Sequence, residues 1–223
     1  MAADGCCYNR RIWPPLMTEE SPSRRAVCAA CLRAQSACIC AWVCPLDLPA
    51  GLLILQHPLE VANAKNSARL LHLCVRGSVL AVGETFDASK LDTLLHAAGR
   101  MPVLLYPQTP GVDCLETDEL PPPDQLLIVV LDATWRKSRK MLHLNPALAA
   151  LPRLALSGMP ASNYRIRKAH AADQLSSLEA GAYALGQVTG DMALVALLLD
   201  AFDGFVQQQA GFVPPDAART REA

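Results

Sequence analysis

The sequence lacks the features that mark exported, membrane-spanning or strongly basic proteins. Its 20 lysines and arginines are offset by 21 aspartates and glutamates, for a formal net charge of −1. Bulk charge therefore gives no argument for nucleic-acid binding, which must depend on where the cations lie. Residues 1–11 contain no apolar export segment. The longest apolar run near the C-terminus, 193–199, is far shorter than the roughly 20 residues that span a bilayer. We expect a cytoplasmic protein with no membrane segment.

Several enzyme motifs are also missing. No G-x-G-x-x-G follows an apolar run and no G-x-x-x-x-G-K-[ST] is present, so classical dinucleotide and P-loop binding are not indicated. The G-x-S-x-G elbow of many hydrolases and the H-x-E…P-C-x-x-C signature of zinc deaminases are absent as well.

The composition, with 52% hydrophobic and 18% charged residues, is typical of a chain that folds around a substantial core. The order of its features predicts four segments. These are a tail at 1–25, a cysteine-rich zinc-binding module at 26–48, a catalytic domain at 49–211 and a tail at 212–223.

Within the main domain, short apolar runs alternate with segments of helical periodicity. Strands are expected at 52–55, 78–82, 102–106, 126–131 and 154–156, and helices at 62–75, 89–98, 134–144, 176–187 and 192–209. Residues 109–124 are rich in proline and aspartate and are expected to form a loop. This order predicts an α/β fold, in which helices cover both faces of a parallel sheet. Ligands of such sheets bind beyond the carboxyl ends of the strands.

Nine cysteines is a high count for a chain of this length. In a reducing compartment a disulfide framework is not expected, so their spacing matters. Cys28, Cys31, Cys38 and Cys40 form a C-x2-C-x6-C-x-C pattern, which suits a closed, structural Zn²⁺ site. The C-x-C pair is tighter than the usual C-x2-C, and Cys44 is a possible substitute ligand. The alternative is a set of buried, unpaired cysteines.

Polar residues follow two of the expected strands. Asp132, Thr134 and Trp135 come directly after 126–131, and Gln56 and His57 come after 52–55. Asp132 either takes part in chemistry or belongs to a turn, and Thr134 can cap the next helix. His57 is an acid, a base, an RNA contact or a structural histidine in a proline turn. Trp135 either stacks on a base or lies in the core.

Cations gather beside these motifs. They are Lys65 and Arg69, then Arg136, Lys137, Arg139 and Lys140, and finally Arg165, Arg167 and Lys168. Such groups can contact the phosphates of RNA without reading its sequence. The alternative is an ordinary solvated helix face.

The segment at 175–180 has the S-x-x-E spacing of a capping box, through Ser176 and Glu179. A helix N-terminus also presents free backbone N–H groups. Ser176 and Ser177 can therefore help to hold a ligand carboxylate while the box holds the helix.

Taken together, these motifs resemble the DTW-domain family over residues 28 to 205. They are the cysteine pattern, Ile54-Leu-Gln-His-Pro58, Asn66-Ser-Ala-Arg-Leu-Leu71, Leu104-Leu-Tyr-Pro107, Leu131-Asp-Ala-Thr-Trp135, Tyr164-Arg-Ile-Arg-Lys168 and Leu175-Ser-Ser-Leu-Glu-Ala180. The residue between the named Asp and Thr is usually glycine, and here it is Ala133. Ser67 and Ser177 stand where threonine is common.

The resemblance implies a SPOUT-like fold, which is knotted in related methyltransferases. It also implies a tRNA-uridine aminocarboxypropyltransferase that uses S-adenosylmethionine as its co-substrate. Catalysis is expected at Asp132, as a base, with Thr134 and Trp135. Cofactor contacts are expected at Gln56, His57, Pro107, Leu131, Ser176, Ser177 and Glu179. Three rivals remain: a SPOUT-type RNA methyltransferase, a non-catalytic zinc-containing RNA-binding module, and aminocarboxypropyl transfer to ribosomal RNA.

Overall fold

The computed structural model describes residues 26–96, 98–156, 158–162, 164 and 175–212. The expected tail at 1–25 and nearly all of the tail at 212–223 lie outside these residues, as do Arg165, Arg167 and Lys168. Within the described ranges, no helix is long and apolar enough to cross a membrane.

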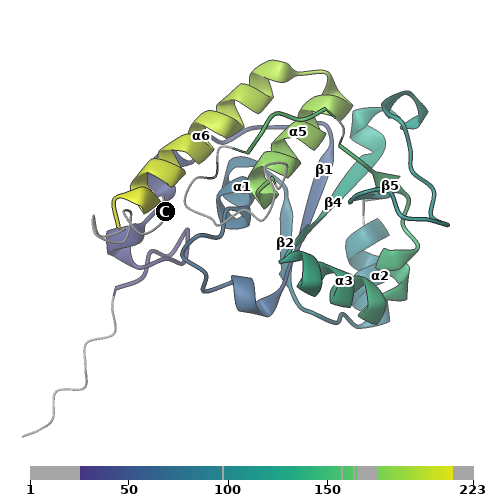
Figure 1. Ribbon diagram of the computed structural model, residues 1–223, viewed down its shortest axis with the longest axis horizontal. Coiled ribbons are helices and arrows are strands. Elements are labelled where there is room, and N and C mark those ends of the chain that lie inside the picture. Colours follow the sequence, from purple (N-terminus) through teal and green to yellow (C-terminus); the bar gives the residue numbers. More distant parts are fainter. Residues whose placement is uncertain (1–25, 97, 157, 163, 165–174, 213–223) are drawn as a thin grey trace, which may run out of the picture.

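One five-stranded parallel sheet forms the centre of the molecule, with the strand order β2-β1-β4-β3-β5 (Figure 1). The strands are β1 (Gly51–Gln56), β2 (Val79–Val82), β3 (Met101–Leu105), β4 (Leu126–Asp132) and β5 (Arg153–Leu154). The prediction of an α/β fold with a parallel sheet is thereby confirmed.

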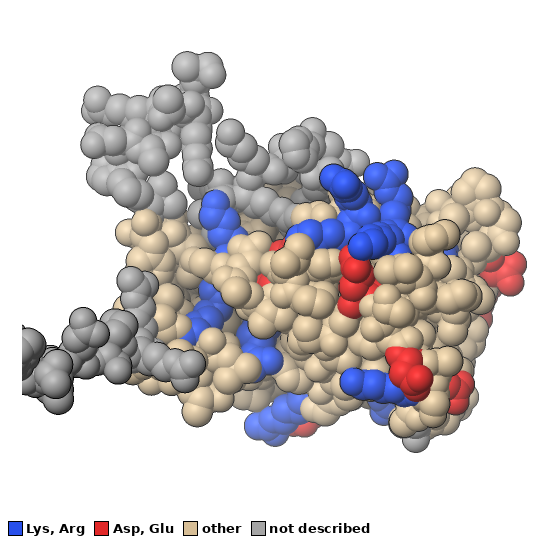
Figure 2. Space-filling view, turned by 90° about the horizontal axis from the view of Figure 1, so that it is seen from below, with Lys and Arg blue, Asp and Glu red and all other residues tan. Residues whose placement is uncertain are grey.

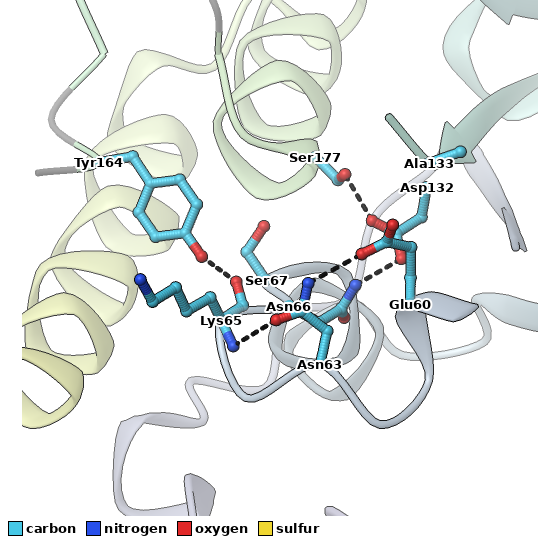
Figure 3. Close-up of a pocket in the computed structure, with 9 residues that line it drawn as sticks. All are labelled: Glu60, Asn63, Lys65, Asn66, Ser67, Asp132, Ala133, Tyr164 and Ser177. Carbon is cyan, nitrogen blue, oxygen red and sulfur yellow. Dashed lines mark hydrogen bonds between the residues drawn. The ribbon is translucent and has the colours of Figure 1, made fainter. Parts of the chain in front are cut away.

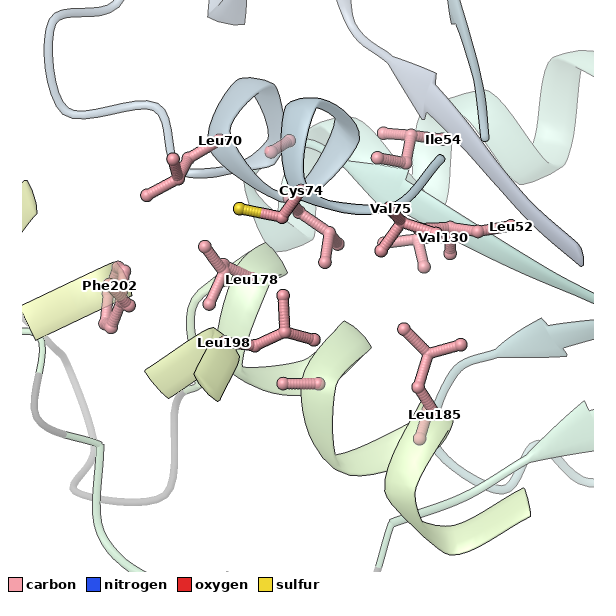
Figure 4. Close-up of a cluster of buried hydrophobic side chains, with 14 of the residues drawn as sticks. Leu52, Ile54, Leu70, Cys74, Val75, Val130, Leu178, Leu185, Leu198 and Phe202 are labelled. Atoms are coloured by element: carbon pink, nitrogen blue, oxygen red, sulfur yellow. The ribbon is translucent and has the colours of Figure 1, made fainter. Parts of the chain in front are cut away.

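Helices cover both faces of this sheet (Figure 1). They are α1 (Ala68–Cys74), α2 (Ala88–His96), α3 (Trp135–Leu144), α4 (Pro146–Ala149), α5 (Ser177–Thr189) and α6 (Met192–Ala210). Side chains of β1 alternate between the faces. Leu52 and Ile54 join the core under α1, α5 and α6 (Figure 4), whereas Leu53 and Leu55 join the core under α2, α3 and α4. This alternation explains why the strand is apolar throughout.

Short 3-10 helices occupy the connections: η1 (Gln35–Ala37), η2 (Cys40–Trp42), η3 (Pro58–Glu60), η4 (Thr117–Glu119) and η5 (Pro123–Gln125). The last two lie in the segment that was expected to be a loop. The helix expected at 62–75 was predicted too long, because α1 begins only at Ala68. Asn63 explains the difference: its side chain accepts a hydrogen bond from the backbone N–H of Lys65 at 3.0 Å, which favours a turn over a helix.

The last strand also differs from the prediction, because β5 covers Arg153–Leu154 and not 154–156. Arg153 is 2% exposed, and its guanidinium donates to the carbonyls of Leu148, Ala149 and Leu151 at the end of α4. These acceptors lie only two to five residues before Arg153, but apolar periodicity does not indicate a buried arginine at this position.

Residues 26–48 pack against α6. The indole Nε1 of Trp42 donates to Gln208 Oε1 at 2.6 Å, and Gln208 Nε2 donates to the carbonyl of Cys38 at 2.9 Å. Ile39 and Cys31 are buried in the same core cluster as α1, α5 and α6. Gly204 on α6 faces the Trp42 ring so closely that a Cβ there would lie 2.2 Å from a ring carbon.

We therefore expect Gly204→Ala to destabilise the protein. Alanine favours a helix, but the ring of Trp42 must move, and such overpacking costs about 1–3 kcal/mol. We expect a net loss of roughly 1–2 kcal/mol in the free energy of unfolding, measured by urea denaturation. Gly211→Ala, where the added Cβ makes an ordinary 3.4 Å contact with a backbone oxygen, is the control and should change stability by less than about 0.5 kcal/mol. Equal stability of the two variants would show that Trp42 does not pack tightly on α6.

Candidate active site

The site lies where the two central strands end. Gln56 and Asp132 are register partners at the carboxyl ends of β1 and β4, and both side chains are buried. From β1 the chain continues to β2 on one side, and from β4 it continues toward β5 on the other. Ligands of open α/β sheets bind at such a switch in strand order.

Three side chains donate to the carboxylate of Asp132, and Figure 3 shows two of them, Asn66 and Ser177. Gln56 Nε2 and Asn66 Nδ2 donate to Oδ2 at 2.8 and 2.5 Å, and Ser177 Oγ donates to Oδ1 at 2.6 Å. The donors come from β1, from the turn before α1 and from the start of α5. The carboxylate therefore joins three parts of the chain that are distant in sequence.

Among the described residues, no donor occupies the last acceptor position of this carboxylate. A carboxylate has about four lone-pair sites, two on each oxygen. Oδ2 receives two donors and Oδ1 receives one from the described residues. Asp132 lines a pocket together with Glu60, Asn63, Lys65, Asn66, Ser67, Ala133, Tyr164 and Ser177. A ligand in this pocket can therefore donate an N–H or O–H to Asp132 Oδ1.

Asn66 was not predicted as a site residue. Its Oδ1 accepts from Gln56 Nε2 at 3.3 Å and from the backbone N–H of Arg69 at 3.2 Å, which fixes Nδ2 toward Asp132. The expected helix at 62–75 would have placed Asn66 in a helix interior. The available signal was the pair Asn63 and Asn66, because asparagine favours turns and helix starts.

Glu60 and Asn63 were also missed. Glu60 is 8% exposed, accepts from Lys137 Nζ at 2.8 Å and accepts from Asn63 Nδ2 at 2.9 Å. These contacts tie the turn between β1 and α1 to helix α3. A glutamate after Q-H-P gives no sequence signal of such a partner 77 residues away.

The start of α5 carries the predicted capping box. Ser176 Oγ accepts from the backbone N–H of Glu179 at 3.2 Å, and Glu179 Oε2 accepts from the backbone N–H of Ser176 at 2.7 Å. Glu179 also accepts from Ser162 Oγ, at 2.8 and 3.0 Å to its two oxygens. The side chains of Ser176 and Glu179 thus form hydrogen bonds that hold the start of α5. Ser177, which follows Ser176, lines the pocket.

His57 is engaged at both ring nitrogens. Nδ1 accepts from the backbone N–H of Leu59 at 3.1 Å and so caps η3. Nε2 then carries the proton and donates to Glu84 Oε1 at 3.0 Å. Lys140 Nζ also donates to Glu84 Oε2, at 2.9 Å. The hydrogen bond from Lys140, and after it the one from His57, lowers the pKa of the Glu84 carboxyl. This geometry is that of a structural histidine in a proline turn.

Ala133 lines the pocket, but the predicted catalytic residues Thr134 and Trp135 are not among its lining residues. Thr134 occupies the N-cap position of α3, but its side chain makes no capping hydrogen bond, so the cap expected of its hydroxyl is not formed. Trp135 is 47% exposed and meets the ring of Tyr106 edge-on at 5.6 Å between centroids. It is therefore not a core residue. Pro107 is exposed, and Leu131 packs on the face covered by α2 and α3.

Cations gather on the side of the molecule that carries α3 (Figure 2). Lys137 and Lys140 form ion pairs with Glu60 and Glu84. Arg136 and Arg139 are exposed, and their side chains form no hydrogen bond or ion pair with any residue that the structure describes.

The two cations before β2 have different surroundings. Lys65 lines the pocket, and the hydroxyl of Tyr164 donates to its carbonyl. Arg69 reaches toward the cysteine module, where its Nη2 donates to the carbonyl of Ala30 at 3.4 Å. The third expected group, at 165–168, lies outside the described residues.

The predicted cysteine cluster comes together and can hold a metal ion. The four sulfur atoms of Cys28, Cys31, Cys38 and Cys40 lie within 4.8 Å of one another. Two of the S···S distances are 3.7 and 3.8 Å, and a tetrahedron with metal–sulfur bonds of about 2.3 Å has edges of about 3.8 Å. Backbone N–H groups of Cys31 and Ala30 lower the pKa of Cys28 to about 6, which favours the ligating thiolate. Cys44 lies 3.7 Å from Cys74 and is outside this group.

Comparison with known proteins gives a consistent set of relatives. The family model described as DTW domain matches residues 25–210. The mouse (Mus musculus) protein "tRNA-uridine aminocarboxypropyltransferase 2" is 28% identical over 173 residues, which is 74% of this chain and 57% of the relative. The Macaca fascicularis protein of the same name is 27% identical over 182 residues, 78% of this chain and 60% of the relative.

A plant protein, "tRNA-uridine aminocarboxypropyltransferase A" of Arabidopsis thaliana, is 26% identical over 140 residues, 56% of this chain and 53% of the relative. The chain thus matches between 53% and 60% of the length of these curated relatives. No solved structure matches the chain.

Proposed function

Because this chain belongs to the DTW domain family, we propose that it is a tRNA-uridine aminocarboxypropyltransferase. It transfers the 3-amino-3-carboxypropyl group of S-adenosylmethionine to N3 of a uridine and releases 5'-methylthioadenosine. The relatives named above support the reaction and the tRNA substrate. The observation that carries the proposal is Asp132, a buried carboxylate with one open acceptor position at a pocket on the carboxyl edge of the sheet.

Asp132 fits the proton transfer that this reaction requires. Uridine N3 carries a weakly acidic proton, and it forms a bond to the γ-carbon of the methionyl chain while the bond from that carbon to sulfur breaks. The electron pair of the broken bond goes to sulfur, which leaves as a neutral thioether. The N3 proton goes to Asp132 Oδ1, the oxygen with the free lone pair. Cytidine has no hydrogen on N3, so the same acceptor favours uridine.

The remaining residues fit positioning roles. Gln56, Asn66 and Ser177 orient the carboxylate, and such orientation determines whether N3 can attack the γ-carbon in line. Of the expected cofactor contacts, Ser177 lines the pocket. Gln56 contacts Asp132 directly, and Leu131 precedes Asp132 on β4. Pro107 follows β3 at the same edge of the sheet.

The fold and the compartment belong to the same proposal. A SPOUT-like fold is what the family resemblance implies, and the parallel sheet supports it at the level of fold class. The cytoplasm is the expected compartment, because free thiols persist in a reducing environment.

The first experiment is incubation of the purified protein with unmodified tRNA and S-adenosylmethionine, followed by mass spectrometry of the digested nucleosides. We expect a uridine that carries one aminocarboxypropyl group and an equal amount of methylthioadenosine. A methyl-sized gain with S-adenosylhomocysteine would identify a methyltransferase. Modification of ribosomal RNA alone would assign a different RNA substrate, and binding without turnover would identify a binding module.

Asp132→Asn tests the proposed base. The two donors at Oδ2 select the amide oxygen of the new side chain, so its NH₂ group faces Ser177 and the pocket as a donor. We expect single-turnover transfer to fall by at least about 100-fold, because base catalysis contributes a factor of roughly 10² to 10⁴. The control Asp200→Asn, on the exposed side of α6, should keep normal turnover. Near-normal turnover in Asp132→Asn would remove Asp132 as the base.

Zinc is the proposed ion of the cysteine cluster, since four thiolates at tetrahedral distances suit it. Protein purified under reducing conditions should contain about one zinc per chain by elemental analysis, as one closed four-ligand site requires. Cys38→Ser should lose most of this zinc, whereas Cys114→Ser should keep it, because Cys114 is not part of the cluster and pairs with Arg153 of β5. A full equivalent of zinc in Cys38→Ser would show that these four thiols are not the ligands.

Arg136 and Arg139 are the proposed phosphate contacts of α3, because they have no partner within the described part of the protein. Arg136→Ala and Arg139→Ala should each weaken tRNA binding and reduce the slope of log K against log salt by about 1. Lys140→Ala removes a cation of the same helix that is already paired with Glu84, and it should change the affinity less. Equal salt slopes in all three variants and the wild type would exclude α3 as the RNA contact.

A further inference from the structure

Arg33 links the cysteine cluster to the turn that holds Asp132. It lies between the two cysteine pairs in sequence and was not among the predicted site residues. Its Nη1 donates to the carbonyl of Ala64 and its Nη2 to the carbonyl of Asn66, both at 2.6 Å. Its guanidinium carbon also lies 5.1 Å from the ring centroid of Phe205 on α6. The head group is thus held from two sides and faces into the protein.

The backbone at the cluster fixes the start of the Arg33 side chain. Cys28 N–H donates to the carbonyl of Arg33 at 2.8 Å, and Leu32 N–H donates to the carbonyl of Cys28 at 2.9 Å. Leu32 has a φ of 59° and is the only non-glycine residue of the described chain in the left-handed region. An L-residue with a side chain adopts this conformation only when its surroundings impose it. The turn formed by Cys28 and Cys31 therefore determines the direction in which Arg33 leaves the cluster.

The other end of this link is the catalytic carboxylate of the proposed reaction. The backbone of Asn66 receives the hydrogen bond from Arg33, and the side chain of the same residue donates to Asp132 at 2.5 Å. Two carbonyls in one turn suit the planar, two-pronged guanidinium, whereas a lysine ammonium cannot reproduce both bonds with the same geometry. Other bonds hold the same turn: Asn66 N–H donates to the carbonyl of Asn63, and the hydroxyl of Tyr164 donates to the carbonyl of Lys65. The two bonds from Arg33 differ from these in joining the turn to the cysteine module.

We propose that Arg33 is a positioning residue, which transmits the geometry of the cysteine cluster through Asn66 to Asp132. The proposal rests on the proposed function in assigning catalysis to Asp132, but the structural link is independent of it. It makes the cysteine cluster a part of the catalytic apparatus. If the cysteine cluster only stabilised the fold, replacement of Arg33 would leave the orientation of Asn66 unchanged.

The test compares Arg33→Ala and Arg33→Lys with the wild type. Arg76→Ala is the matched control, because Arg76 forms an exposed ion pair with Asp47 and has no hydrogen bond to the 64–66 turn. Transfer kinetics with tRNA and S-adenosylmethionine are measured with the zinc content of each variant. In parallel, the side-chain NH₂ signals of Asn66 are followed by ¹⁵N NMR in the free protein and assigned by their loss in Asn66→Asp.

We expect both Arg33 variants to keep their metal and to shift the Asn66 signals, while Arg76→Ala shifts neither. In Arg33→Ala, kcat should fall by about 10-fold or more with KM for tRNA changed less than threefold, because misplacement of a reacting group acts on turnover. Arg33→Lys should fall between Arg33→Ala and the wild type.

Three results would overturn the proposal. Unchanged Asn66 signals in both Arg33 variants would show that the link does not exist. A rise in KM for tRNA with a reduced salt slope would make Arg33 an RNA contact, and loss of the metal would make it a support of the cluster itself. If the wild type shows no transfer at all, the proposed function fails, and the NMR comparison still decides whether Arg33 orients Asn66.

Discussion

The arrangement of the site depends on the hydrogen bonds of one buried carboxylate, that of Asp132. A carboxylate removed from water is costly unless hydrogen bonds replace its hydration. Asp132 obtains these bonds from Gln56, Asn66 and Ser177, which belong to a strand, a turn and a helix that are far apart in sequence. The network can form only when the sheet has its observed strand order and α5 lies over the β1–β4 edge. The same donors leave one acceptor position open toward the pocket, so the requirement for folding also prepares the chemistry.

The charges of α3 show how a chain with a net charge of −1 can present cations to an anionic partner. Glu60 and Glu84 pair with Lys137 and Lys140, and these pairs fix the helix beside the site. The side chains of Arg136 and Arg139 on the same helix form no ion pair within the described residues, so they can contact an external anion. The positions of the charges on this surface, and not the net charge of the chain, therefore determine what the surface can bind. The arginines are also the better choice for phosphates, because a guanidinium can donate two parallel hydrogen bonds.

The parts of the fold that depend on near neighbours in sequence were predictable. The apolar strands, the capping box of Ser176 and Glu179, and the convergence of the four cysteines all follow from spacing. The start of α1 was predicted wrongly, because Asn63 and Asn66 use their side chains to form a turn where apolar spacing alone favoured a helix. Glu60, Asn66 and Arg33 were not found, because their roles depend on partners from 31 to 77 residues away. Such pairings arise from tertiary packing, which a local pattern does not encode.

A metal bound in the cysteine module would matter beyond its own ligands. Residues 26–48 contain only short 3-10 helices, so regular secondary structure contributes little to their order. Small segments of this kind are usually ordered by a metal or a disulfide, and the free energy of metal binding then becomes free energy of folding. Here Ile39 and Cys31 are part of the main core, and Trp42 is seated on Gly204 of α6. The stabilisation is therefore shared with the sheet and its helices. A cluster some distance from the pocket in sequence thus contributes to the rigidity that an oriented carboxylate requires.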